Sequence, residues 1–170
     1  MNKIIIILAT LLLSMVFANA QTSEKEMQFG GRIMYDMAAW GAEEFEYTGS
    51  EFRRVRLYSS GKMYVNIKYK LQLDFSGGKI SFKDVWMELS KLPLNGNIRV
   101  GHFKEPLRLE GLTSSKYITF MERALPIAMS AERNTGAMYH TTFGEKISLQ
   151  TGVFREGDSF GNDKESTNNI

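Results

Sequence analysis

The chain has 170 residues, no cysteine, and a formal net charge of +2 that arises from 21 Lys and Arg against 19 Asp and Glu. The near balance of charge excludes a general electrostatic attraction to nucleic acid, so any electrostatic function depends on where the charges lie. The absence of cysteine excludes disulfide bonds, which exported soluble domains often use, and favours a fold closed by backbone hydrogen bonds.

The N-terminus has the pattern of an export signal. Lys3 precedes an apolar run at residues 4–17, and the small residues Ala18 and Ala20 flank Asn19 in a cleavage-site pattern. A run of this length is too short to cross a bilayer as a helix, which takes about 20 residues. We therefore expect residues 1–20 to be a cleaved signal peptide, with an N-terminal anchor or a buried helix as the alternative.

The first part of the exported chain predicts two strands. Residues 29–40 and 51–60 both alternate between apolar and charged side chains, as a strand with two unlike faces does. The acidic segment 41–50, which begins with glycine and ends in Gly-Ser, predicts an exposed loop between them. Residues 59–62, SSGK, predict a tight turn into the next strand.

The longest alternation covers residues 63–75, MYVNIKYKLQLDF. Its odd positions are apolar and its even positions are polar or charged, so an extended chain has one apolar and one polar face. Strands of soluble sheets usually have about five or six residues. A tilted strand that spans a membrane needs about 9–11, with apolar side chains toward lipid and polar ones toward a wet lumen. The length favours a membrane barrel, although a long soluble hairpin has the same alternation.

Four more strands follow. Residues 79–90 change the face of their apolar side chains partway, which predicts a β-bulge near Asp84. Residues 98–103 predict a short strand, and residues 135–143 and 147–155 predict a final hairpin. The whole chain is thus predicted to be all-β and to contain seven strands.

Residues 104–134 show no strand alternation. Loops longer than about 12–15 residues are uncommon unless they have a function or are disordered. Apolar residues recur at helical spacing between Phe120 and Leu125, and Pro126 ends the pattern. We expect a folded loop that contains a short helix.

The connections support the barrel interpretation. Long links are expected after the first, fifth and seventh strands and short links after the second, fourth and sixth, as in outer-membrane barrels, although the short third link breaks the rule. Bacterial barrels have even numbers of strands, and seven is odd. We therefore predict that residues 21–170 form the N-terminal portion of a longer antiparallel transmembrane β-barrel.

Several sequence blocks occur in an order and spacing that resemble the N-terminal part of the phosphate-selective porin O/P family of Gram-negative outer membranes. The resemblance covers about residues 29–156. The blocks are GRIMYD (31–36), FRRVRL (52–57), YKLQLDF (69–75), ISFKDVW (80–86), GHFKEP (101–106), LEGLTSSKYITFMER (109–123) and RNTG (133–136).

The resemblance implies a sixteen-stranded barrel in the outer membrane, assembled as a homotrimer. It implies that the segment 104–134 folds inward as a constriction loop, and that basic side chains along the lumen bind and pass anions such as phosphate or polyphosphate. No cofactor is implied. Because acidic residues accompany the basic ones in the loop, we expect a porin for small anions or solutes. The alternative is a small structural barrel or a non-conducting fragment.

Strand phase places five basic side chains on the polar faces of three consecutive strands: Arg32, Arg54, Arg56, Lys68 and Lys70. Such a row could guide anions, with arginine able to grip an oxyanion through two donors. Equally, these side chains could pair with Asp36, Asp74 and Glu88 in a lattice that stiffens the wall. The phase of Arg53 points it outward.

In the loop, Lys116, Arg123 and Arg133 could line the narrowest point of the pore. The alternative is that the neighbouring pairs Glu122/Arg123 and Glu132/Arg133 fix the loop to the wall.

An enzyme is the competing class. A hydrolase site needs a nucleophile, a nearby base and a third group that orients the base. Ser114 or Ser115 with His140 has the required residue types, but neither serine lies in a Gly-x-Ser-x-Gly nucleophile elbow. His102 and His140 lack metal-ligand spacing. We expect neither catalysis nor a metal.

Overall fold

The computed structural model describes residues 26–42, 45–120, 122–130, 132–144 and 146–162. Within them, seven strands form one antiparallel sheet in chain order, as the sequence predicts. The strands are β1 (Glu26–Ala42), β2 (Phe45–Tyr64), β3 (Ile67–Asp74), β4 (Ser81–Leu92), β5 (Gly96–Lys104), β6 (Arg133–Phe143) and β7 (Ile147–Arg155). The sheet is open, because β1 and β7 each pair with one neighbour among the described strands.

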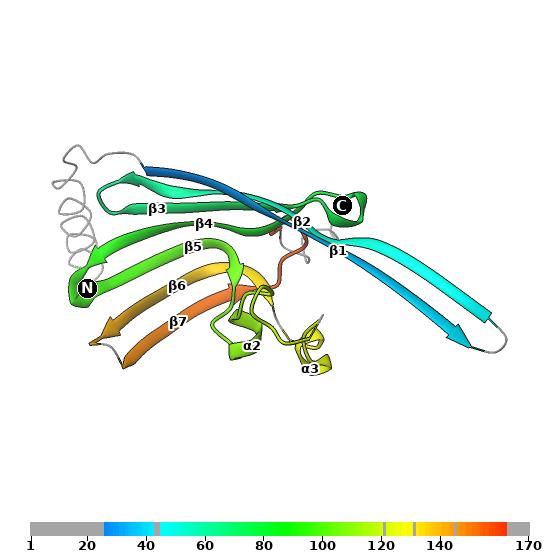
Figure 1. The fold of residues 1–170 in the computed structure, drawn as a ribbon. Coiled ribbons are helices and arrows are strands. Elements are labelled where there is room, and N and C mark those ends of the chain that lie inside the picture. The colour runs from blue at the N-terminus through cyan, green and yellow to red at the C-terminus, as the bar shows by residue number, and fades with distance from the viewer. Residues whose placement is uncertain (1–25, 43–44, 121, 131, 145, 163–170) are drawn as a thin grey trace, which may run out of the picture.

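The sheet is curved, and the links at its two ends differ in length (Figure 1). The turns after β2, β4 and β6 lie at one end, and the turn after β4 contains the 3₁₀ turn η2 (Pro93–Asn95). At the other end are the 3₁₀ turn η1 (Ser76–Gly78) and the segment 105–132, which contains the short helices α2 (Leu109–Leu112) and α3 (Leu125–Ala128). We call this segment the β5–β6 loop, and the face of the sheet that it contacts the inner face.

The predicted loop at 41–50 is wrong for the residues that the structure describes. Residues 41–42 belong to β1, and residues 45–50 belong to β2. The part of β2 before Arg56 forms strand pairs only with β1, so the first hairpin projects beyond the other strands as a two-stranded ribbon (Figure 1). Cross-strand aromatic pairs stabilise this ribbon, including Tyr35 with Phe52 at 4.9 Å between ring centroids.

The predicted turn at 59–62 is also wrong, and the predicted strand 63–75 is divided. Residues 59–62 continue β2, and the chain turns at residues 65–66 before β3 begins at Ile67. Gly61 is required by close strand pairing, because a Cβ there would overlap the carbonyl oxygen of Glu26. The long strands of this sheet are therefore β1 and β2, with 17 and 20 residues.

The outer face of the sheet is apolar and exposed. Ile33, Leu57, Met87, Val100 and Val153 lie on it, each with more than half of its surface accessible. Among the described residues, only two hydrophobic side chains are buried, Phe103 and Met138. A soluble sheet would bury such an apolar face in a core. Among the described residues, no helix is both long and apolar enough to cross a membrane.

Gly101 of β5 provides a test of how closely the strands are packed. Its φ is +136°, and a Cβ there would overlap the carbonyl oxygen of Val85 and lie 2.7 Å from the Cα of Trp86. Because both obstacles are backbone, we expect Gly101→Ala to lower the free energy of unfolding by about 1–3 kcal/mol. Urea unfolding of the variant and the unaltered protein in detergent micelles measures this change in the free energy of unfolding.

The matched control is Gly111→Ala in the loop, where an added Cβ would have no atom within 4 Å. Its effect should stay below about 0.5 kcal/mol. Equal losses in the two variants would contradict close packing at Gly101.

Candidate functional site

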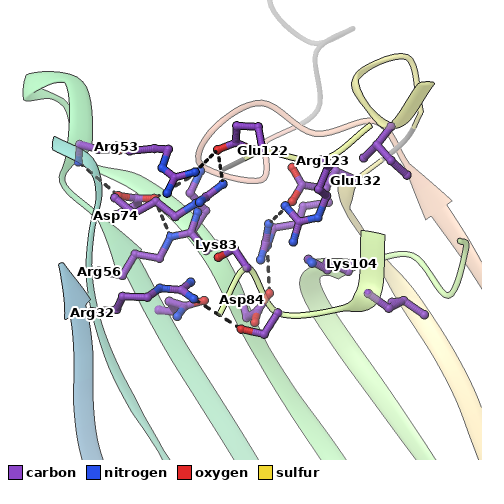
Figure 2. Close-up of a pocket in the computed structure, with 18 of the residues that line it drawn as sticks. Arg32, Arg53, Arg56, Asp74, Lys83, Asp84, Lys104, Glu122, Arg123 and Glu132 are labelled. Atoms are coloured by element: carbon purple, nitrogen blue, oxygen red, sulfur yellow. Dashed lines mark hydrogen bonds and ion pairs between the residues drawn. The ribbon is translucent and has the colours of Figure 1, made fainter. Parts of the chain in front are cut away.

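A cavity of about 730 Å³ lies between the β5–β6 loop and the inner face. Basic side chains from β1, β2 and the loop converge on it (Figure 2). Among its described lining residues, nine are basic and four are acidic. The basic ones are Arg32, Arg53, Arg54, Arg56, Lys70, Lys83, Lys104, Arg123 and Arg133. The cavity therefore has an excess of five positive charges.

A register shift between β1 and β2 concentrates arginines at one side of the cavity. The pairing changes between Met34 and Tyr35, opposite the pair Arg53-Arg54, so one extra residue is accommodated in β2. Arg53 and Arg54 consequently both line the cavity. The outward direction expected for Arg53 is wrong, because this irregularity reverses the simple alternation.

Two buried or half-buried carboxylates organise the strand cations. Asp74 is 2% exposed and accepts a hydrogen bond from Arg56 Nε at 2.7 Å. Asp84 binds two cations that are far apart in sequence, Lys70 at 2.7 Å and Arg133 at 3.0 Å. Each carboxylate thus fixes the position of charged side chains from neighbouring strands.

The predicted bulge near Asp84 is confirmed. The β3–β4 pairing shifts between Leu71 and Leu73, so Lys83 and Asp84 together oppose a single residue of β3. Both side chains line the cavity as a result. Without the extra residue, one of them would point to the apolar outer face.

The β5–β6 loop is braced by its own polar groups. Arg123 donates to the carbonyl oxygens of Glu110 at 3.0 Å and Thr113 at 2.7 Å. The Glu110 carboxylate accepts a hydrogen bond from the backbone N–H of Ala124 at 2.9 Å. Lys104 at the end of β5 donates to the carbonyl oxygen of Gly111. These contacts fold the loop into a fixed shape.

Three cavity cations have no carboxylate partner within the described part of the chain. They are Arg32, Lys104 and Arg123, and their hydrogen bonds go to neutral oxygens. Arg32 Nη1 donates to Ser114 Oγ at 3.4 Å, and its Nε is buried without a partner. The positive charge of these three groups is therefore available to an anion in the cavity.

The acidic side of the cavity remains charged at neutral pH. Partial loss of water raises the pKa of the Glu132 carboxyl, but the positive charges of Arg133, Lys104 and Arg123 outweigh this effect. The pKa of Glu132 is thus held below its ordinary value. The excess positive charge of the cavity persists with this carboxylate ionised.

Residues 27–169 match the family model described as Phosphate-selective porin O and P. The chain belongs to this family. The match implies that the sheet is part of a β-barrel membrane protein of the Gram-negative outer membrane.

A curated relative is also similar to this porin chain. It is Porin O of Pseudomonas aeruginosa, which is 27% identical over 150 residues. The alignment covers 78% of this chain and 34% of the relative, so the chain spans about a third of the length of that protein. No solved structure matches this chain.

The porin cavity contains six of the eight predicted site residues: Arg32, Arg54, Arg56, Lys70, Arg123 and Arg133. Lys68 lies elsewhere on the wall, 3.7 Å from Glu88. Lys116 is exposed on the loop and does not line the cavity. Sequence reasoning missed Arg53, Lys83 and Lys104. The phase change in residues 79–90 is the signal from which Lys83 could have been found.

The observed ion pairs agree in part with the alternatives in which the charges hold the wall and the loop together. Asp74 pairs with Arg56 and Glu88 lies 3.7 Å from Lys68, as the lattice hypothesis expects, whereas Asp36 pairs with Arg53, which that hypothesis did not include. Glu132 pairs with its neighbour Arg133 at 2.8 Å. Glu122 contacts the wall, but its partners are Arg53 and Arg54 of β2.

One serine motif escaped the sequence analysis. Gly157-Asp158-Ser159-Phe160-Gly161 matches Gly-x-Ser-x-Gly, a pattern that can mark a nucleophile. Ser159 lies in a turn after β7, and its carbonyl oxygen accepts from Phe82 N–H at 2.8 Å. His102 Nδ1 instead contacts Thr135 Oγ1 at 3.3 Å. Within the described residues no histidine bonds to Ser159.

Backbone N–H groups of Asn162 and Phe160 lower the pKa of Asp158 by donating to its carboxylate. That carboxylate is therefore engaged within its own turn. The described residues also contain no group of three or more His, Asp or Glu that could hold a metal ion.

The wall network predicts a large effect for Asp84→Asn. The change leaves Lys70 and Arg133 close together without the carboxylate that joins them. We expect the free energy of unfolding in urea to fall by about 1–3 kcal/mol.

The control is Glu26→Gln, which removes a carboxylate from an exposed pair with Lys62 at 3.3 Å. It should cost less than about 0.5 kcal/mol. A cost for Asp84→Asn as small as that of the control would show that the network does not stabilise the wall.

Proposed function

We propose that this chain forms part of an outer-membrane porin that passes small anions or solutes by diffusion. The single observation that carries the proposal is the excess positive charge of the cavity. In a water-filled pore, fixed charges at a narrow point select the ions that pass. The three cations without carboxylate partners, Arg32, Lys104 and Arg123, are the groups that an anion would meet.

The proposal includes a complete barrel. The open sheet leaves strand edges that a membrane cannot solvate, so further strands must close it. We propose sixteen strands and a homotrimer, on the family resemblance. The β5–β6 loop would then be the constriction, because it already lies on the inner face against the basic cavity. The predicted signal peptide, residues 1–20, lies outside the described residues and stays a prediction.

Oxyanions such as phosphate fit the cavity better than spherical anions. Arginine presents donors in a planar fork that matches two oxygens of one anion. Five of the nine basic lining residues are arginines of β1, β2 or the β5–β6 loop. Phosphate, polyphosphate and similar oxyanions are therefore the proposed ligands among the solutes that pass. A non-conducting structural barrel is the competing outcome.

The complete porin in planar bilayers tests the proposal. We expect a reversal potential that shows anion preference, and Arg32→Gln or Arg123→Gln should lower the chloride-to-potassium permeability ratio about two- to fivefold. Lys116→Gln removes the same charge from outside the cavity and should change the ratio little.

A cation preference in the unaltered porin, or the absence of ion steps, would contradict the proposed function. If Lys116→Gln lowered the permeability ratio as much as the cavity variants do, the selectivity would come from the overall charge of the protein and not from the cavity.

The orientation of the wall gives a second test. Val100 of β5 is 54% exposed on the outer face. If that face contacts lipid near the middle of the bilayer, Val100→Arg should cost about 2–4 kcal/mol of folding free energy in lipid vesicles. Val100→Leu is the control and should fold as the unaltered porin does. Full tolerance of the arginine would exclude Val100 from the lipid-facing surface.

A further inference from the structure

Glu122, in the middle of the β5–β6 loop, lies against two adjacent arginines of β2 (Figure 2). Its Oε1 atom is 2.8 Å from Arg54 Nη2 and 3.3 Å from Arg53 Nη1. Both arginine side chains are largely buried, with 13% and 10% of their surface accessible, whereas the Glu122 side chain is 55% accessible. The strand thus supplies a fixed pair of guanidinium groups, and the loop supplies an accessible carboxylate that occupies them.

The arginine pair has the features of an oxyanion site. Consecutive residues of a regular strand point to opposite faces, so two neighbouring arginines converge only where the register shifts. The irregularity opposite Met34 and Tyr35 brings Arg53 and Arg54 to the same cavity. One Glu122 oxygen accepts from both guanidinium groups, in the place that an oxygen of a passing oxyanion would take.

The same contact holds the middle of the loop to the wall. In the described part of the loop, Glu122 is the only residue that forms an ion pair with β1 or β2. Ser114 adds a hydrogen bond from Arg32 at 3.4 Å. The ends of the loop are held separately, because Glu105 accepts a hydrogen bond from Asn134 at 2.6 Å and Glu132 pairs with Arg133. Loss of the Glu122 contact would therefore leave the middle with only the long Arg32–Ser114 hydrogen bond to β1 and β2 among the described contacts, while both ends stay fixed.

We propose that Glu122 is an internal counter-anion that a permeating oxyanion displaces, and that this exchange releases the middle of the loop from the wall. The occupant is an anion with two or more acceptor oxygens, such as phosphate, because it can match the two guanidinium groups. The exchange is feasible since the carboxylate is more than half accessible, so an anion in the cavity can reach it. The inference rests on the proposed passage of anions, which brings the competing ligand to the site.

A spin label on the loop tests the exchange without requiring ion current. Tyr117 is 80% exposed in the loop, and this chain has no cysteine, so Tyr117→Cys provides a single labelling position in it. The complete porin carrying this label is titrated with phosphate at constant ionic strength. We expect phosphate to increase the mobile fraction of the label, with an effect at least about threefold larger than that of chloride.

The informative variants are Glu122→Gln and Glu132→Gln. Both remove one negative charge from the cavity at side chains of similar exposure, 55% and 50%. Glu122→Gln should make the label mobile without phosphate and abolish its response. Glu132→Gln should keep the phosphate-dependent release, because Glu132 pairs with the adjacent residue and does not join the loop to β2.

Phosphate block of the chloride current gives a second readout. Glu122→Gln removes the loop carboxylate from Arg53 and Arg54 and leaves Arg53 paired with Asp36 through Nε. The half-blocking phosphate concentration should therefore fall about three- to tenfold, against less than about twofold for Glu132→Gln. A label that does not respond to phosphate, or that responds equally to chloride, would overturn the inference. Similar shifts of block in both variants would overturn it as well.

The two proposals can fail separately. Anion current together with an unresponsive label contradicts the role of Glu122 and leaves the porin function in place. A phosphate response of the label in a protein without anion current supports the exchange at Glu122 and contradicts the proposed function.

Discussion

The pairing of Asp74 and Asp84 with cations is the interaction on which the inner wall depends. Each strand of this sheet must present charge on one face and apolar side chains on the other, so like charges on adjacent strands are brought together. Arg32 lies directly opposite Arg56 in the β1–β2 register, a repulsive arrangement unless a carboxylate is near. Asp74 at 2.7 Å from Arg56 supplies it, and Asp84 does the same for Lys70 and Arg133. The carboxylates make a dense basic wall possible.

That arrangement bears on both hypotheses for the wall charges, the ladder that guides anions and the lattice of ion pairs. A wall of unpaired cations would repel itself, and a fully paired wall would have no charge left for an anion. The structure divides the two tasks between groups. Arg56 and Lys70 pair with carboxylates of neighbouring strands, whereas Lys104 and Arg123 are held by carbonyl oxygens of the loop. Carbonyl dipoles fix the direction of a cation without cancelling its charge.

Much of the fold follows from alternation in the sequence, and the errors occur where alternation is locally ambiguous. The seven strands, their order and the bulge near Asp84 were predictable because strands with two unlike faces show a strict alternation of apolar and polar residues in the sequence. The turn at 59–62 was predicted from glycine and serine, but Gly61 serves close strand contact instead. The ribbon was missed because acidic residues and glycines at 41–50 resemble a loop. In fact, the segment also contains the alternating β-formers Phe45 and Tyr47.

The site was less predictable than the sheet for a related reason. Phase identified Arg32, Arg54, Arg56 and Lys70, each of which lies directly opposite a residue of a neighbouring strand. Arg53 was assigned to the wrong face, because a bulge reverses the alternation and its position depends on the partner strand. The loop residues depend on tertiary contacts alone. Arg123 enters the cavity because Glu110 and Thr113 accept its donors, whereas Lys116 is left exposed, and nothing in their local sequence separates the two.

The register shift near Arg53 connects the stability of the wall with the position of the β5–β6 loop. A shift of this kind costs backbone pairing, and the two arginines that it brings together repel each other. The loop carboxylate of Glu122 offsets this repulsion, so the position of the loop and the charge state of the wall are coupled through one contact. In the proposed porin, an oxyanion that binds Arg53 and Arg54 would take the place of Glu122 and so remove the contact that holds the middle of the loop to the wall.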